Sequence, residues 1–209
     1  MRTAAVILAA GPSTRLGFPK QLVRVNGVSL VRRLALSLCD AGIDKIGVVT
    51  GAWHSELEKE LAGLDVEVIH NSSWKEGMSS SVACGAAWVD GLTVEHKGIF
   101  LATDQWKIAS DDITNILAEY EKGQADVIGA SYNGRWGMPL LVGSKSLLQA
   151  LVSITSEVGF LNFMESRSTD IVSVPMEHAA QDLDTPAQLM ELSEHFDVTV
   201  MRSGSLSAI

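Results

Sequence analysis

The sequence predicts an α/β protein: a three-layer sandwich whose mostly parallel, Rossmann-like sheet lies between two layers of helices. Continuous apolar runs such as residues 4–8 and 46–49 are typical of strands buried on both faces of a sheet. They alternate with segments such as residues 28–41, in which apolar residues recur at helical spacing. Because right-handed crossovers join such strands and helices, we expect the strands to be parallel neighbours.

Each element follows from one of these two patterns. Buried apolar runs predict strands at residues 4–8, 45–50, 66–70, 98–103, 126–130, 138–142 and 170–174. Helical spacing predicts helices at residues 28–41, 53–61, 79–89, 110–120, 144–151 and 156–165. Asn133-Gly134 predicts a tight turn between two strands. Thr185-Pro186-Ala187-Gln188 begins a last helix with a capping box and a proline in its first turn.

The composition is that of an ordinary globular domain. The chain has 209 residues, 46% of them hydrophobic and 20% charged, with a net charge of −9. This length is sufficient for one α/β domain with its own core, and the negative charge argues against a general nucleic-acid surface. We expect one domain over residues 1–197. Because the end of the chain is small and polar, we expect residues 198–209 to form a flexible tail.

The cysteines and the apolar runs predict a location. Cys39 and Cys84 are too few for a disulfide framework and indicate a reducing compartment. Both lie in apolar helical patterns, where we expect buried, inert thiols. The sequence shows neither a secretory signal nor a run of membrane-spanning length. We therefore expect a cytoplasmic protein with no membrane partner.

A loop rich in glycine and hydroxyl residues follows the first strand. It reads Leu8-Ala9-Ala10-Gly11-Pro12-Ser13-Thr14-Arg15-Leu16-Gly17-Phe18-Pro19-Lys20. Such a loop can aim backbone N–H groups at an anion, and Arg15 and Lys20 can neutralise charge on the same ligand. The pattern indicates a polyphosphate site that is neither a Walker loop nor a GxGxxG loop. A surface loop with two solvated cations is the alternative.

Carboxylates follow two later apolar segments. Asp104 comes directly after the strand at 98–103, and Asp182 and Asp184 alternate along an extended segment, so both point to one side. Magnesium prefers carboxylate and phosphate oxygens, so the three aspartates can hold one or two magnesium ions. Capping of the last helix by Asp184 or Thr185 is the alternative. Because ligands bind at the carboxyl ends of parallel strands, we expect Asp104 and the glycine loop to face one cleft.

The pattern Leu-Ala-Ala-Gly-x-Ser-x-Arg-x-Gly-x-x-Lys resembles the signature loop of the NTP transferase, or nucleotide-diphospho-sugar transferase, superfamily. In that family the loop wraps the triphosphate of an NTP. The resemblance implies the fold of that superfamily and catalytic roles for Arg15 and Lys20. It also implies nucleotide contacts from Leu8, Ala9, Ala10, Gly11, Arg15, Lys20, Gly51, Gly77, Ser79 and Ser80.

Three further motifs sharpen the resemblance. Leu101-Ala102-x-Asp104-Gln105 and Asp182-x-Asp184-Thr185-Pro186 resemble the metal-binding pair of the superfamily, which implies Mg²⁺ on Asp104, Asp182 and Asp184. The segment 69–82 is similar to one in the molybdenum cofactor cytidylyltransferases, a subgroup of the superfamily. Gly137-Met138-Pro139 resembles the Gly-His-Pro strand of that subgroup.

The sequence departs from this subgroup where the acceptor binds. The Asp-Gln-Pro motif of the subgroup becomes Asp104-Gln105-Trp106, and Met138 replaces the histidine of Gly-His-Pro. The acceptor motif Gly-Asp-x-Gly-Ala-Arg is replaced by residues 156–161. The nucleotide half of the expected site is therefore intact, whereas the acceptor half is altered.

We expect a magnesium-dependent nucleotidyltransferase of the molybdenum cofactor cytidylyltransferase type. It would transfer CMP from CTP to a phosphorylated small molecule such as molybdopterin cofactor and release pyrophosphate. The expected partners are the NTP, the acceptor and, transiently, a molybdoenzyme maturation partner, but not nucleic acid. Two alternatives remain: a different acceptor, such as a sugar phosphate or phosphocholine, and a nucleotide- or cofactor-binding protein without turnover.

Overall fold

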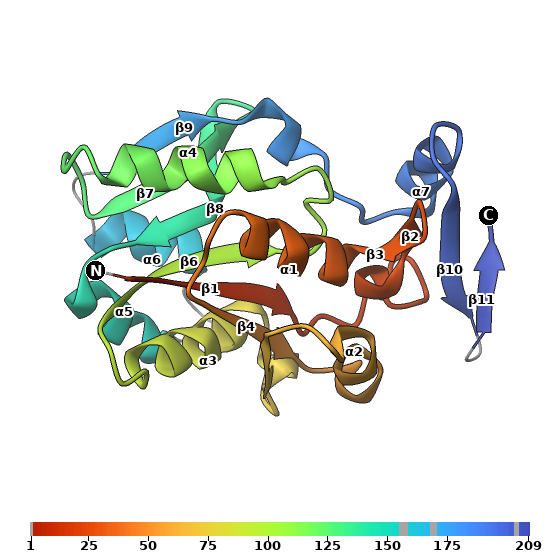
Figure 1. Ribbon diagram of the computed structural model, residues 1–209, viewed down its shortest axis with the longest axis horizontal. Coiled ribbons are helices and arrows are strands. Elements are labelled where there is room, and N and C mark those ends of the chain that lie inside the picture. Colours follow the sequence, from red (N-terminus) through yellow and green to blue (C-terminus); the bar gives the residue numbers. More distant parts are fainter. Residues whose placement is uncertain (1, 155–158, 168–170, 203–204) are drawn as a thin grey trace.

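The computed structural model describes residues 2–154, 159–167, 171–202 and 205–209. Its central sheet has seven strands in the order β5-β4-β1-β6-β8-β7-β9 (Figure 1). Their bounds are β1 Arg2–Ala9, β4 Lys45–Thr50, β5 Glu67–His70, β6 His96–Ala102, β7 Val127–Tyr132, β8 Arg135–Val142 and β9 Ile171–Pro175. Strand β8 runs antiparallel to both of its neighbours, and the other pairings are parallel. The predicted α/β class with a mostly parallel sheet is confirmed.

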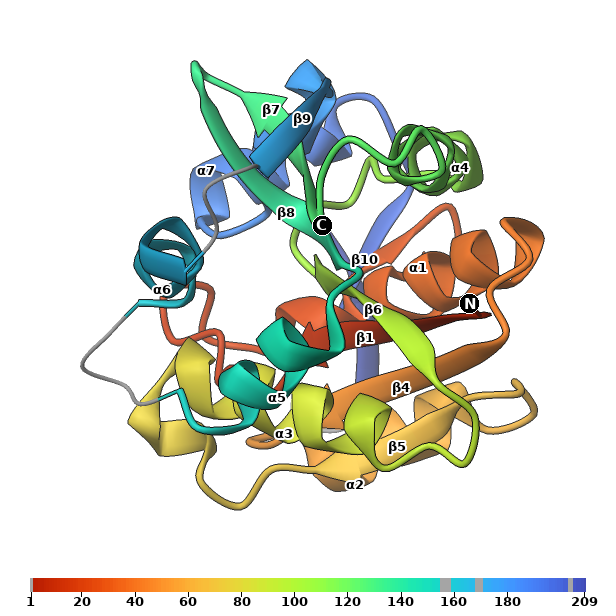
Figure 2. The same ribbon diagram turned by 90° about the vertical axis from the view of Figure 1, so that its left-hand side faces the viewer.

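Helices cover both faces of this sheet. The helices of the described residues are α1 Leu30–Asp40, α2 His54–Leu61, α3 Met78–Asp90, α4 Ser110–Tyr120, α5 Lys145–Val152, α6 Phe160–Arg167 and α7 Pro186–Ser193, of which α7 packs against the small sheet described below. Helices α1 and α4 lie on one face, whereas α3, α5 and α6 lie on the other (Figure 2). Strand β1 serves both faces because its side chains alternate: Ile7 joins the core under α1, and Val6 joins the core under α3. This explains why β1 is apolar without interruption.

Most expected elements match the structure to within a few residues. The turn at Asn133-Gly134 joins β7 to β8, and both of its residues have positive φ, as a tight hairpin turn requires. The helix expected at 156–165 begins at Phe160 instead, and residues 155–158, which include part of the altered acceptor motif, lie outside the described residues.

The end of the chain corrects one expectation. Residues expected to be a flexible tail form β10 (Val198–Arg202) and β11 (Ser205–Ala208), in a small sheet with β2 (Arg24–Val25) and β3 (Val28–Ser29). Val198 and Val200 are buried in a third core cluster with residues of the glycine loop and α7. The run of β-branched residues Val198-Thr199-Val200 is a strand signal that the small, polar composition of the last residues obscured.

The cysteines correct another expectation. Cys39 is exposed, because it lies outside the buried stripe of α1 that contains Leu34, Ala35 and Leu38. Cys84 is partly buried, and that burial raises the pKa of its thiol. Among the described residues, no helix is both long enough and apolar enough to cross a bilayer.

Candidate active site

Loops from three parts of the chain meet at the carboxyl ends of the central strands. The loop after β1, the loop after β6 and the start of α3 surround an open cavity of about 260 Å³. The hydroxyl of Thr103, after β6, donates to the carbonyl oxygen of Leu8 at 3.3 Å and so joins the first two loops. The glycine loop and Asp104 therefore face one cleft, as the strand order predicts.

The cavity contains part of the expected nucleotide-binding set. Lining residues from that set are Leu8, Ala10, Gly11, Lys20 and Gly77. Members of the set that do not line the cavity are Ala9, Arg15, Gly51, Ser79 and Ser80. A Cβ on Gly51 would approach the side chain of Trp74 to 2.6 Å and the carbonyl oxygen of Ala10 to 2.7 Å. Gly51 is therefore required for close packing beneath the loop.

Lys20 lies at the centre of the charged groups. Its Nζ is 2.6 Å from Asp104 Oδ2 and 2.7 Å from Asp184 Oδ1. Asp184 also accepts a hydrogen bond from Arg15 at 2.7 Å, although the Arg15 side chain is 69% exposed. The two cations of the loop and two of the three predicted aspartates thus form one connected network.

The surroundings of these groups determine their protonation. Burial acts to lower the pKa of Lys20, but the neighbouring carboxylates outweigh it and the pKa is raised, so the ammonium stays charged. Burial acts to raise the pKa of Asp184, but Lys20 and Arg15 outweigh it and the pKa is lowered. For Asp182 the attraction of Lys20 is too weak to compensate: burial, followed by repulsion from Asp104 and Asp184, raises its pKa to about 6.

The three predicted metal ligands do not behave alike. Asp104 and Asp184 converge on one ammonium, whereas Asp182 forms no ion pair within the described part of the chain and lines a second cavity of about 340 Å³ beside Trp106 and α7. Within the described ranges, no three His, Cys, Asp or Glu side chains are arranged to hold a metal. Two converging carboxylates nevertheless fit Mg²⁺, which commonly binds one or two carboxylates together with substrate phosphates.

The N-cap of α7 is Thr185 and not Asp184, so the capping alternative does not apply to Asp184. The hydroxyl of Thr185 accepts from the backbone N–H of Gln188 at 3.3 Å, and Gln188 Oε1 accepts from the backbone N–H of Thr185 at 2.9 Å. This is the predicted capping box, with Thr185 as its N-cap. The Asp184 carboxylate is therefore left for Lys20 and Arg15.

The start of α3 differs in detail from the expectation. Asn71 Nδ2 donates to the hydroxyls of Ser80 at 2.9 Å and Ser81 at 3.1 Å. The Ser80 hydroxyl in turn donates to the carbonyl oxygens of Ser73 and Gly77, so it is used locally. Met78 and Ser81 line the cavity. These two residues lie one helical turn apart and share a face of α3. That spacing is the sequence signal that would have selected them instead of Ser79 and Ser80.

Comparison with known proteins decides the family. The model of the MobA-like NTP transferase domain matches residues 5–171 of this chain, which is more than half of it. The chain belongs to this family. The motifs that suggested the superfamily, from the glycine loop to Gly137-Met138-Pro139, lie inside the matched region, and the segment Asp182–Pro186 follows it.

Two curated relatives of this NTP transferase domain match shorter segments. The bifunctional IPC transferase and DIPP synthase of Thermococcus kodakarensis is 38% identical over 91 residues, 42% of this chain. The 2-C-methyl-D-erythritol 4-phosphate cytidylyltransferase of Thermobifida fusca is 43% identical over 65 residues, 29% of this chain. The matches cover only 21% and 26% of the length of these relatives.

Solved structures share the fold over nearly the whole NTP transferase domain. Rv0371c from Mycobacterium tuberculosis has a TM-score of 0.77 at 21% identity, with 93% of this chain and 99% of that chain covered. Molybdopterin-guanine dinucleotide biosynthesis protein A from Archaeoglobus fulgidus has a TM-score of 0.68 at 16% identity, with 92% and 97% covered. At these identities the likeness establishes the fold.

Two glutamines of the NTP transferase domain were given no role in the sequence analysis. Both are buried beside the site. Gln21 and Gln105 directly follow Lys20 and Asp104, and each side-chain amide donates to two main-chain carbonyl oxygens of other segments. The position of a glutamine directly after a charged site residue is only a weak indication, by itself, that its side chain supports the site. Trp106, which departs from the subgroup motif, packs edge-on against Phe196, with the ring centroids 5.4 Å apart.

Proposed function

We propose that this chain is a divalent-metal-dependent nucleotidyltransferase that transfers a nucleoside monophosphate from an NTP to a phosphorylated small molecule. One observation carries the proposal. Lys20 and Arg15 of the loop converge with Asp104 and Asp184 beside a cavity at the carboxyl ends of the strands. Membership of the MobA-like NTP transferase family supports the same reaction class.

The reaction needs positioning and charge more than an acid or a base. An oxygen of the acceptor phosphate attacks the α-phosphorus of the NTP, a new P–O bond forms, and the bond to the β-phosphate oxygen breaks. The electron pair of that bond leaves with pyrophosphate. Lys20 is held in the cleft and charged, so its ammonium can stabilise negative charge on the phosphates. Arg15, at the rim, can add a second cation.

Asp104 and Asp184 are the residues that would hold the metal. A divalent cation held there would neutralise negative charge on the phosphates of the NTP. Support comes from the convergence of the two carboxylates, and a related structure, Rv0371c, has been solved as a complex with manganese. Mg²⁺ is the metal that we propose, because hard oxygen ligands and phosphates suit it.

We propose CTP as the nucleotide and molybdopterin cofactor as the first acceptor to test. The segment 69–82, whose resemblance suggested cytidylyl transfer, borders the cavity through Gly77, Met78 and Ser81. A matched relative is named a cytidylyltransferase, which supports CTP. The name of that relative specifies a sugar-alcohol phosphate as its acceptor. Because Trp106 and Met138 also replace residues of the subgroup's acceptor motifs, a sugar-alcohol phosphate is our second candidate acceptor.

Pyrophosphate release tests the proposal. Each of the four NTPs is combined with Mg²⁺ or Mn²⁺ and with one acceptor of each class: molybdopterin cofactor, a sugar phosphate, a sugar-alcohol phosphate and phosphocholine. We expect metal-dependent release with CTP and one phosphorylated acceptor. Release with GTP alone would overturn the base assignment and leave the reaction class standing. Binding of NTP without release for any acceptor would favour a binding protein, and no binding of any NTP would overturn the proposal.

A further inference from the structure

A buried glutamine lies beneath the glycine loop, directly after Lys20. Gln21 is 1% exposed and belongs to a short 3-10 helix, Lys20–Leu22. Its Nε2 donates to the carbonyl oxygen of Ala9 at 3.0 Å and to that of Gly11 at 2.8 Å. One side chain therefore ties the end of β1 to the first turn of the loop.

The other end of the same amide contacts the middle of the loop. Gln21 Oε1 accepts a hydrogen bond from the Ser13 hydroxyl at 3.3 Å, and that hydroxyl oxygen accepts from the backbone N–H of Lys20 at 3.1 Å. The bonds thus run in one connected set from Ala9 and Gly11, through Gln21 and Ser13, to the main chain of Lys20.

Ser13 needs such support because its backbone is strained. Its φ is +57°, in the left-handed region that few residues other than glycine adopt. The carbonyl oxygen of Ser13 also accepts from the backbone N–H groups of Leu16 and Gly17, each at 3.1 Å. The loop therefore folds back on itself at Ser13, and Gln21 lies beneath that turn.

We propose that Gln21 is a positioning residue for the nucleotide: it holds the loop in the shape that presents Lys20 and the loop N–H groups to the triphosphate. The inference rests on the proposed function. The contacts of Gln21 go to the loop and not to Asp104 or Asp184, so its loss changes the path of the loop and leaves the carboxylates in place.

Gln21→Met tests this role because methionine is close in size and has no amide hydrogen atoms. The loss leaves the carbonyl oxygens of Ala9 and Gly11 without this donor. We expect the Kd of a non-hydrolysable CTP analogue with Mg²⁺ to rise roughly tenfold, the scale of one or two lost hydrogen bonds. KM for the NTP should rise by a similar factor, whereas kcat should fall less.

Hydrogen exchange of residues 8–22 gives a readout that does not depend on the reaction. We expect faster exchange in Gln21→Met for this segment and unchanged exchange for α4. Ser13→Ala keeps both hydrogen bonds that the Gln21 side-chain amide donates, so its exchange in this segment should increase less. Because the two variants break one connected set of bonds, their combined effect on Kd should be less than the sum of the single effects.

Two controls separate positioning from general loss of stability. Gln149→Met makes the same substitution on the exposed surface of α5 and should change neither Kd nor exchange in the loop. Ile113→Val, on the buried face of α4, should lower the melting temperature and leave Kd unchanged. If Gln21→Met does not fold, Ser13→Ala alone tests the inference through Kd and loop exchange.

The outcomes decide separately on the inference and on the proposed function. Wild-type Kd and wild-type loop exchange in folded Gln21→Met would overturn the inference, as would a Kd change no larger than that of a stability-matched Ile113→Val. If the wild-type protein binds no NTP, the proposed function fails. In that case, unchanged loop exchange in Gln21→Met would also refute the claim that Gln21 holds the loop in shape. Faster exchange would support that claim, and the loop would then serve a ligand other than an NTP.

Discussion

Two lysines with little exposed surface form ion pairs at opposite ends of the sheet, and their surroundings differ. Lys97, on β6 near its amino end, pairs with Glu121 at 2.5 Å and lies 4.4 Å from the ring of Tyr120. Glu121 is 69% exposed, so one cation meets one solvated anion. Lys20, at the carboxyl ends, meets two partly buried carboxylates with a third nearby.

The difference separates a structural ion pair from the cluster that we propose as a ligand site. At Lys97 one anion balances the charge and the ammonium lies over the ring of Tyr120, so the lysine is satisfied without a ligand. At Lys20 two aspartates contact the ammonium. A third, Asp182, forms no ion pair in the described part of the chain, and its pKa is raised to about 6 by burial and by repulsion from the other two. Clustered carboxylates of this kind are costly for folding and are typical of sites that bind cations and phosphates.

Asp104→Asn should have the largest effect. It removes negative charge from the carboxylate pair with little change in shape, because the amide has the same size. We expect no detectable pyrophosphate release and a melting temperature close to that of the wild-type protein. Wild-type release at saturating Mg²⁺ would show that Asp104 does not hold the metal.

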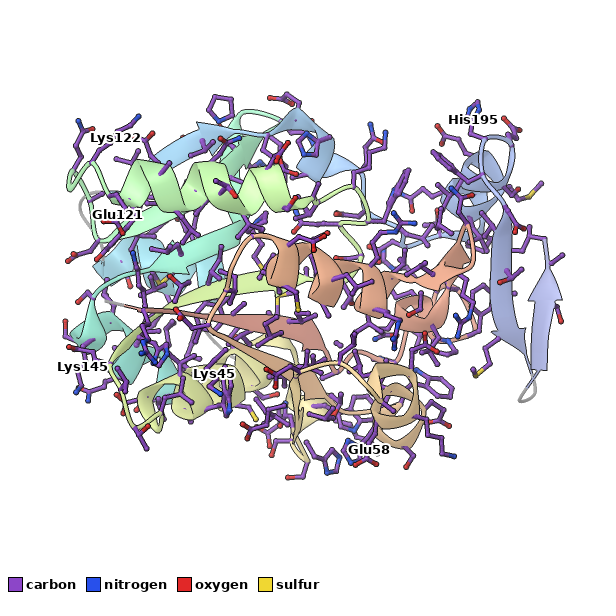
Figure 3. All side chains as sticks on the ribbon, viewed as in Figure 1. Lys45, Glu58, Glu121, Lys122, Lys145 and His195 are labelled. Atoms are coloured by element: carbon purple, nitrogen blue, oxygen red, sulfur yellow. The ribbon has the colours of Figure 1, made fainter. Side chains whose placement is uncertain are left out.

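Lys20→Met should have the next largest effect. Loss of one charge contact to a reacting phosphate commonly slows an enzyme about 100-fold or more, and we expect a fall of that size in pyrophosphate release. Lys45→Met is the matched control, since Lys45 lies at the amino end of β4, away from the cleft (Figure 3). An unchanged rate in Lys20→Met with a large loss of stability would make Lys20 a structural residue like Lys97.

Asp182→Asn should change stability in a direction set by pH. A raised folded pKa means that the native state binds a proton more tightly than the unfolded state, so stability falls as the pH rises toward and through about 6. The variant should remove this slope and raise the free energy of unfolding at pH 7 by about 1 kcal/mol, after screening of a half-exposed group. Denaturant unfolding in chelator at a series of pH values measures it; a steeper slope in the variant would contradict the assignment.

Lys97→Met should have the smallest effect. Its partner Glu121 stays hydrated after the change, so no buried charge is left unpaired. We expect the free energy of unfolding to change by less than about 1 kcal/mol, with turnover unaltered. A loss of turnover here would erase the distinction between the two lysines.

The sequence predicted local features of the molecule better than contacts between distant residues. The strands, the glycine loop and Asp104 were predictable because apolar runs, glycine content and position at a strand end are local signals. The ion pairs of Lys20 with Asp104 and Asp184 were not, since these partners lie 84 and 164 residues away in the chain. Only the folded sheet shows that Asp184 joins the network while Asp182 lines another cavity.

Local patterns also failed where one side chain serves a distant segment. Gln21 and Asn71 are buried polar residues whose value lies in the main-chain and hydroxyl groups that they reach, and nothing in their neighbours in sequence indicates this. The strand at Val198–Arg202 was hidden for a related reason: its partner β2 is far away at Arg24–Val25. Leu16 and Phe18 of the signature loop belong to the same core cluster as Val198 and Val200 of this strand.

Calorimetric titration with CTP and Mg²⁺ tests the central claim most directly, because it measures whether the cleft around Lys20 binds a metal-bound triphosphate. The wild-type protein and Lys97→Met should bind with equal affinity in Mg²⁺. The wild-type protein should bind CTP more weakly in chelator than in Mg²⁺. Lys20→Met should bind CTP at least tenfold more weakly than the wild-type protein, both in chelator and in Mg²⁺. Equal affinity of Lys20→Met and the wild-type protein for CTP in Mg²⁺ would contradict the account.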